Sequence, residues 1–96
     1  VYEDEDVYAF KDIEPQAPVH VLVIPKKKVG RFAELKGLPR EDVGVFFKKV
    51  SNVAAELGLE EDGYRIVINN GKHGQQTVEY MHAHIIGGRQ MQWPPG

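Results

Sequence analysis

The spacing of hydrophobic residues changes along this chain, and each change predicts a different element of secondary structure. Short β-branched and aromatic segments, bounded by glycine, proline or acidic residues, are typical of strands. One such segment is nearly continuously apolar, which is typical of a strand buried on both faces. The sequence predicts an acidic hairpin (1–2 and 7–10), this apolar strand (19–24), a fourth strand (64–69) and a fifth around residue 82.

The longest predicted element is a helix over about residues 40–57. Pro39 suits its first turn, where the backbone N–H that proline lacks would have no helical partner, and Gly58 suits its C-terminal cap. A shorter helical turn is predicted over residues 31–35. The apolar residues of the long helix form one core-facing stripe at a spacing of three and four: Val43, Phe46, Phe47, Val50, Val53, Ala54 and Leu57. Five strands and one long helix predict an α+β fold, with the helix on one face of a sheet.

Composition limits the classes of protein that this chain can represent. Its 96 residues, 42% of them hydrophobic, predict one soluble domain over residues 1–96. A net charge of −2 gives no broad attraction for nucleic acid, and no apolar segment has membrane-spanning length. The absence of cysteine excludes disulfides and thiolate chemistry and is compatible with the cytoplasm, where we expect the protein. Because Val1 already lies in a predicted strand, we expect a trimmed or processed N-terminus.

The candidate chemistry lies where two histidines stand one residue apart in a predicted strand. Successive strand side chains point to opposite faces, so His82 and His84 share one face with Tyr80. The alternate residues are apolar and can pack in the core: Met81, Ala83 and Ile85. Two neighbouring imidazoles suit phosphate chemistry, one as a nucleophile and the other as a proton donor. The spacing alone is equally compatible with two solvated histidines.

Two further features favour the chemical interpretation. His20 lies in an apolar strand, where an imidazole needs a hydrogen-bond partner, although a lone histidine there is more often a core residue. The loop over residues 70–76 can present backbone amides to an anion, and it can equally be a plain surface loop. His73, within this loop, is expected to be solvated.

At this point the residues resemble a known family. Residues 80–96 are similar to the histidine-triad (HIT) motif, His-x-His-x-His, and the ending Gly-Gly-Arg-Gln-Met-Gln-Trp-Pro-Pro-Gly resembles its Hint branch. Residues 10–27 and 63–69 resemble the same branch, so the resemblance spans the chain. It implies a half-barrel α+β fold with a five-stranded antiparallel sheet, and a homodimer whose sheet continues across the interface. It also implies hydrolysis of nucleoside phosphoramidates or related adenylates, with a purine nucleotide substrate and no cofactor or metal.

The resemblance also assigns roles to individual residues. His82 corresponds to the nucleophile that attacks the α-phosphorus and becomes nucleotidylated. His84 corresponds to the residue that contacts the phosphate and helps protonate the leaving group, and His20 to a member of the surrounding relay. The other implied nucleotide-binding positions are two polar groups near the phosphate, a carboxylate for the ribose, two residues of the purine wall and a tail residue that reaches the partner subunit's site: Asn69, Thr77, Asp12, Phe10, Ile13 and Trp93.

The chain departs from the family pattern in three places. Tyr80 replaces the first histidine of the triad, although it keeps the backbone carbonyl that orients the nucleophile in the family. Gln75 stands in the nucleotide site where a glycine is usual, and the N-terminal helical segment that completes the purine pocket is absent from these residues. We therefore expect weakened or retuned phosphoramidase chemistry rather than none.

Two other classes of protein remain open on the sequence. One is a non-catalytic adenine-nucleotide-binding or regulatory domain, which Tyr80 and Gln75 make plausible. The other is a metal-binding protein that uses His20, His82 and His84. Against the metal site, the sequence shows no evident carboxylate beside the pair.

Overall fold

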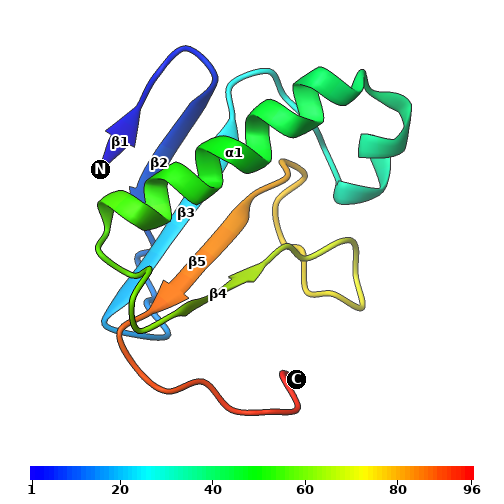
Figure 1. Cartoon of the computed structure of the whole chain (residues 1–96). Coiled ribbons are helices and arrows are strands. Elements are labelled where there is room, and N and C mark those ends of the chain that lie inside the picture. Colours follow the sequence, from blue (N-terminus) through cyan, green and yellow to red (C-terminus); the bar gives the residue numbers. More distant parts are fainter.

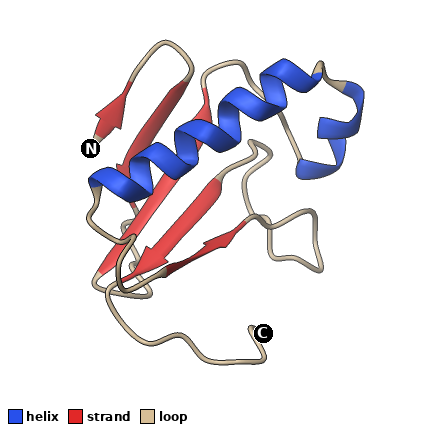
Figure 2. Ribbon diagram, in the orientation of Figure 1, coloured by secondary structure: helices blue, strands red, loops and turns tan.

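The computed structural model describes all residues from 1 to 96 and has a five-stranded antiparallel sheet with one long helix across one face (Figures 1 and 2). The strand order is β1-β2-β3-β5-β4, so β3 and β5, which are far apart in the sequence, lie side by side. The predicted α+β fold is confirmed. The elements are β1 (Tyr2–Glu3), β2 (Val7–Lys11), β3 (Val19–Pro25), the 3-10 helix η1 (Phe32–Gly37), α1 (Arg40–Glu56), β4 (Tyr64–Val67) and β5 (Ala83–Gly87).

The long helix closely follows its prediction, with two differences. Pro39 is the N-cap residue rather than part of the first turn, and Gly58 follows the C-terminus with a φ of +76°, which favours glycine. Phe47 was predicted in the core but is 37% exposed, and its ring lies edge-on to that of Phe46. The buried stripe is therefore narrower and consists of Phe46, Val50, Val53 and Ala54. No helix in the structure is long and apolar enough to cross a membrane.

The strand β3 has two different faces, so the prediction of burial on both was wrong. Val21 and Val23 are buried in the core beneath α1. Leu22 and Ile24, on the opposite face, are only partly buried and line a cleft. One helix covers one face of a sheet, and the apolar residues of the other face remain available to a ligand.

The segment that carries the histidines begins outside the sheet. β5 starts at Ala83, so Tyr80 and His82 precede the strand instead of lying within it. The Met81 N–H donates to the carbonyl of Val29 in a loop, at 2.6 Å, rather than to a neighbouring strand. The predicted alternation of faces nevertheless holds, because Met81, Ala83 and Ile85 are buried while the histidines between them are partly exposed.

An ion pair joins α1 to the turn between β1 and β2. The Lys49 ammonium lies 2.7 Å from Asp4 Oδ2 and 3.5 Å from an Asp6 oxygen. The other Asp4 oxygen accepts the N–H groups of Asp6 and Val7, at 2.8 and 3.0 Å. The hydrogen bond from Lys49 holds the pKa of Asp4 well below its usual range. This carboxylate therefore fixes both the acidic turn and its position on the helix.

Lys49→Met is expected to lower the free energy of unfolding at pH 7, because it leaves the Asp4 carboxylate without its ammonium partner. Since the folded-state pKa of Asp4 is depressed, the stabilisation is present above the unfolded pKa near 3.9 and is lost as the pH falls toward the folded value. Urea unfolding between pH 7 and pH 2 measures this, with Lys48→Met, at the neighbouring exposed lysine, as the control. A difference between wild type and Lys49→Met that does not shrink in acid would contradict the assignment.

Candidate functional site

A cleft of about 870 Å³ opens on the sheet face that α1 leaves uncovered, and it collects nearly all the predicted site residues. They come from the end of β2 and the residues after it, from β3, from the loop after β4, and from β5 and the residues just before it. The lining includes Phe10, Asp12, Ile13, His20, Asn69, Gln75, Thr77, His82 and His84. Segments distant in the sequence therefore meet at one surface.

Trp93 is the predicted site residue that does not line this cleft. Its side chain is 81% exposed, and its ring lies 5.9 Å from the Arg65 guanidinium. Within one chain, the tryptophan therefore takes no part in the site.

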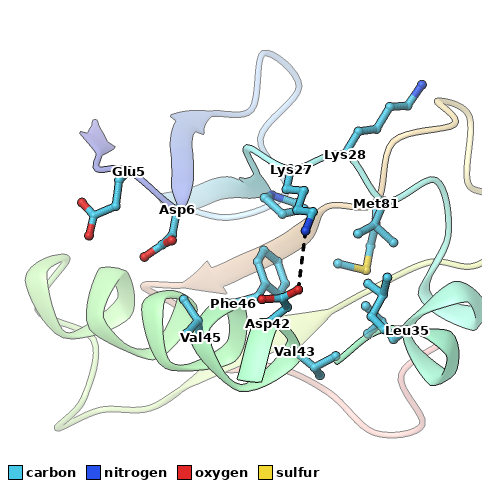
Figure 3. Close-up of a pocket in the computed structure, with 13 residues that line it drawn as sticks. Glu5, Asp6, Lys27, Lys28, Leu35, Asp42, Val43, Val45, Phe46 and Met81 are labelled. Atoms are coloured by element: carbon cyan, nitrogen blue, oxygen red, sulfur yellow. Dashed lines mark ion pairs between the residues drawn. The ribbon is translucent and has the colours of Figure 1, made fainter. Parts of the chain in front are cut away.

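A smaller cavity, of about 180 Å³, lies on the helix side of the sheet (Figure 3). Its lining includes Leu35, Phe46 and Met81, and Lys27 and Asp42 form an ion pair across 3.7 Å at its edge. None of the predicted site residues lines it, so the candidate chemistry belongs to the larger cleft.

The state of His82 is set by a backbone carbonyl. Its Nδ1 lies 2.8 Å from the carbonyl oxygen of Tyr80. Because a carbonyl only accepts hydrogen bonds, Nδ1 carries the proton and Nε2 keeps its lone pair. The carbonyl that the sequence resemblance assigned to this role is therefore in place, although the residue is a tyrosine.

His20 and His84 form a second, oppositely directed chain of hydrogen bonds. The backbone N–H of Gln16 donates to His20 Nδ1 at 3.0 Å, so in the neutral ring the proton is on Nε2. That Nε2 lies 2.9 Å from His84 Nδ1 and 3.3 Å from an Asp12 oxygen. His84 Nδ1 is thus the acceptor, and its proton is on Nε2.

The Nε2 atom of His84 is buried and has no hydrogen-bond partner within the chain. Burial, with further effects from His82 and His20, lowers the pKa of His84 to about 4. The ring is therefore neutral near pH 7 and offers one N–H. The rings of His82 and His84 have centroids 4.9 Å apart, so the site pairs a lone pair on one imidazole with a donor on the next.

The loop beside the histidines is held by side chains that the sequence did not single out. Gln76 accepts the Gly71 N–H at 2.9 Å and donates to the carbonyls of Gly30 and Val78 at 2.8 and 3.0 Å. Asn70 accepts the N–H of Ala33 at 2.8 Å. Polar residues in a polar loop show no periodicity, so the sequence does not distinguish side chains that hydrogen-bond to the loop backbone from side chains that are solvated.

Gln75 occupies a backbone conformation that favours glycine. Its φ is +61°, and it is the only residue other than glycine with a positive φ. This conformation explains why a glycine is usual at the corresponding position of the family that the sequence resembles. The glutamine therefore places a side chain in the cleft at a cost in backbone strain.

A carboxylate does lie beside the histidines, contrary to the expectation from the sequence. Asp12, His20 and His84 each offer one potential metal ligand, all within 4.8 Å of one another, whereas His82 is outside this group. A metal at this point would need the lone pair of His20 Nε2. The Gln16 N–H already uses the lone pair on Nδ1, so the Nε2 of a neutral ring carries its proton. These hydrogen bonds do not fit a zinc site.

Comparisons with known proteins show the family of this chain. The HIT domain family model matches residues 1–91, and the chain belongs to the HIT family. It is 53% identical over 98 residues to the 14 kDa zinc-binding protein of Zea mays, covering all of this chain and 76% of that protein. It is 48% identical over 99 residues to protein pkiA of Dictyostelium discoideum, covering 99% of this chain and 76% of that protein.

Solved structures show the same fold. The HIT family hydrolase from Legionella pneumophila Philadelphia 1 is 41% identical with a TM-score of 0.89, covering 100% of this chain and 86% of that one. A histidine triad nucleotide-binding protein from Candida albicans is 28% identical with a TM-score of 0.77, covering 98% of this chain and 72% of that one.

Gln75→Gly is expected to raise the free energy of unfolding by about 1 kcal/mol, because relief of the strain at φ +61° exceeds the entropy that glycine adds to the unfolded chain. Chemical denaturation measures the change. Gln92→Gly, in the exposed tail and without a positive φ, is the control and should not stabilise the protein. Equal effects of the two substitutions would show that the backbone at Gln75 is not strained.

Wild-type protein is expected to lose stability from pH 6.5 to pH 4 more steeply than His84→Asn. The folded-state pKa of His84, about 4, lies below its ordinary value of 6.5, so the unfolded chain takes up the proton first. This contribution to the free energy of unfolding is complete above pH 6.5 and is lost as the pH falls through the folded value. Because the ring is only half-buried and solvent screens its charge, we expect it to reach about 2 kcal/mol. Parallel pH profiles for the two proteins would contradict a depressed pKa.

Proposed function

We propose that this protein is a nucleotide hydrolase of the Hint type, which cleaves nucleoside phosphoramidates or related adenylates through a nucleotidyl-histidine. The observation that carries the proposal is the pairing of a free lone pair on His82 with a buried, unpartnered N–H on His84 in one cleft. Displacement at phosphorus requires a nucleophile, and a hydrogen-bond donor beside it can stabilise the leaving group and the charge that develops. Two similar proteins of solved structure support the proposal, since one is called a HIT family hydrolase and the other a histidine triad nucleotide-binding protein.

The first step is attack of His82 Nε2 on the α-phosphorus. A P–N bond to the imidazole forms, and the bond from phosphorus to the leaving nitrogen breaks. The Tyr80 carbonyl stabilises the positive charge that develops on the ring, because it accepts the Nδ1–H. The leaving nitrogen takes up a proton from solvent as it departs, and the His84 Nε2–H beside it stabilises it with a hydrogen bond.

The second step is hydrolysis of the nucleotidyl-histidine. Water attacks phosphorus, the bond to His82 breaks, and the proton that the water loses passes to solvent, which leaves both histidines neutral. The loop amides and Thr77 stabilise the negative charge on the phosphate oxygens, since phosphoryl transfer depends mainly on positioning and electrostatics.

The remainder of the cleft suits a purine nucleotide. Asp12 can accept hydrogen bonds from ribose hydroxyls, and its Oδ1 is already oriented by the Glu14 N–H at 2.8 Å. Phe10, Leu22 and Ile24 provide an apolar surface for a base. We further propose a homodimer, in which the edge strand β4, with Ile66 37% exposed, continues the sheet into a second subunit.

A second candidate is a nucleotide-binding module without turnover. It is favoured by Tyr80, which replaces a histidine of the triad, and by the strained Gln75 in the cleft. This candidate predicts AMP binding with neither product release nor a covalent adduct.

The discriminating experiment mixes the protein with an adenosine phosphoramidate and follows AMP release and intact mass after a rapid quench that spares acid-labile bonds. We expect AMP release and an adenylyl adduct on the wild type. His82→Ala should lower turnover at least about a thousand-fold, because it removes the nucleophile, and leave AMP affinity within a few-fold.

His73→Ala is the matched control, since His73 is exposed and does not line the cleft. It should retain full activity. AMP binding by wild-type protein with no release and no adduct would establish the non-catalytic module instead.

A further inference from the structure

We infer that Tyr80 is a positioning residue for the nucleophile, and that its hydroxyl group holds in place the backbone carbonyl that fixes the tautomer of His82. The inference rests on the proposed role of His82. It concerns the position at which this chain departs most visibly from the histidine-triad pattern.

The carbonyl of Tyr80 is not held by the sheet. β5 begins three residues later, at Ala83. The Tyr80 N–H donates to Val78 at 2.8 Å in a local turn, and Met81 donates to the loop carbonyl of Val29 at 2.6 Å. The orientation of the carbonyl therefore depends on how residues 78–82 are attached to the loop after β3.

The Tyr80 side chain supplies that attachment. Its hydroxyl donates to the carbonyl of Pro25, the last residue of β3, at 2.5 Å. The Lys28 ammonium lies 5.8 Å from the centre of the ring, within the range of a cation–π contact. The tyrosine thus reaches from the nucleophile's segment to the end of the neighbouring strand.

Neighbouring residues reinforce the same attachment. Glu79 pairs with Arg31 at 2.7 Å, and Gln76 donates to Gly30 at 2.8 Å. Among these contacts, only that of Tyr80 belongs to the residue whose carbonyl binds His82. Tyr80 thus makes both hydrogen bonds: its hydroxyl donates to Pro25 at 2.5 Å, and its carbonyl accepts from His82 at 2.8 Å.

The consequence for catalysis is a choice between two tautomers. With the carbonyl in place, the proton of His82 stays on Nδ1, and Nε2 is a nucleophile. If the carbonyl moves away, the Nε2–H tautomer becomes populated, and this form has no lone pair on Nε2. The hydroxyl of Tyr80 therefore affects the fraction of competent nucleophile rather than the binding of nucleotide.

Tyr80→Phe tests the inference, because it removes the hydroxyl and keeps the ring. ¹⁵N NMR of histidine-labelled protein reports the tautomer of His82. We expect a shift from Nδ1–H toward a mixture with Nε2–H, a fall in kcat of about tenfold, and KM and AMP affinity within about twofold of wild type. Tyr2→Phe is the matched control, since its hydroxyl donates to Asp4 at 2.9 Å away from the cleft, and it should change neither signal nor kcat.

The outcomes separate this inference from the proposed function. An unchanged His82 tautomer in Tyr80→Phe would overturn the positioning role, whether or not the melting temperature falls. Wild-type protein without turnover would overturn the proposed function, while the NMR measurement would still decide the role of Tyr80.

Tyr80→His provides a second test, because the inference and a simple repair of the triad position predict different changes in kcat. If the tyrosine were a damaged triad position, restoring histidine would raise kcat. Because the phenol bridges to Pro25 and the site depends on this bridge, we expect kcat to stay level or fall. A rise in kcat would overturn the inference.

Discussion

A neutral imidazole carries one proton and one lone pair, and in this cleft backbone groups decide which ring nitrogen has which. The carbonyl of Tyr80 holds the proton of His82 on Nδ1, while the N–H of Gln16 leaves the proton of His20 on Nε2. His84 then receives a hydrogen bond from His20 and keeps its own proton free. Two neighbouring histidines acquire opposite capacities without any difference in residue type.

The sheet makes this arrangement possible by its strand order and register. β3 and β5 are neighbours, with Leu22 opposite His84 and His20 opposite Ile86. His20 and His84 are thus diagonal neighbours on the uncovered face, within reach of each other's rings. On the covered face, α1 packs on the alternate residues of both strands. Core packing consequently fixes the register of β3 against β5, and this register fixes the relative positions of His20 and His84.

Much of this could be predicted from the sequence. The stripe of the long helix and the alternation around His82 depend on local periodicity, and the predicted residues of the cleft came from a family resemblance that covers the whole chain. The contributions of Gln76 and Arg31 could not be predicted, because each acts through contacts with loops distant in sequence. The carboxylate of Asp12 was not recognised beside His20 because the pairing of β2 with β3 brings the two residues together. Local patterns identify the reactive side chains, but the groups that set the tautomers of His82 and His20 belong to the backbone, and residue type does not show how backbone groups are oriented.

The family resemblance and the geometry meet at residue 80. A tyrosine cannot supply the imidazole of a triad, yet the group that contacts His82 is a carbonyl, which every residue possesses. The phenol adds a bond to β3 that anchors this carbonyl. The tyrosine therefore changes what holds this carbonyl in place. The Nε2 atoms of His82 and His84 remain available to a ligand.

In the proposed function, His82 forms a covalent bond to phosphorus. The most direct measurement is the stereochemical course of hydrolysis of an adenosine phosphorothioamidate that is chiral at phosphorus, in isotopically labelled water. Two successive in-line displacements, through a nucleotidyl-histidine, predict net retention of configuration. Net inversion would mean that water attacks the substrate directly and that His82 is not the nucleophile.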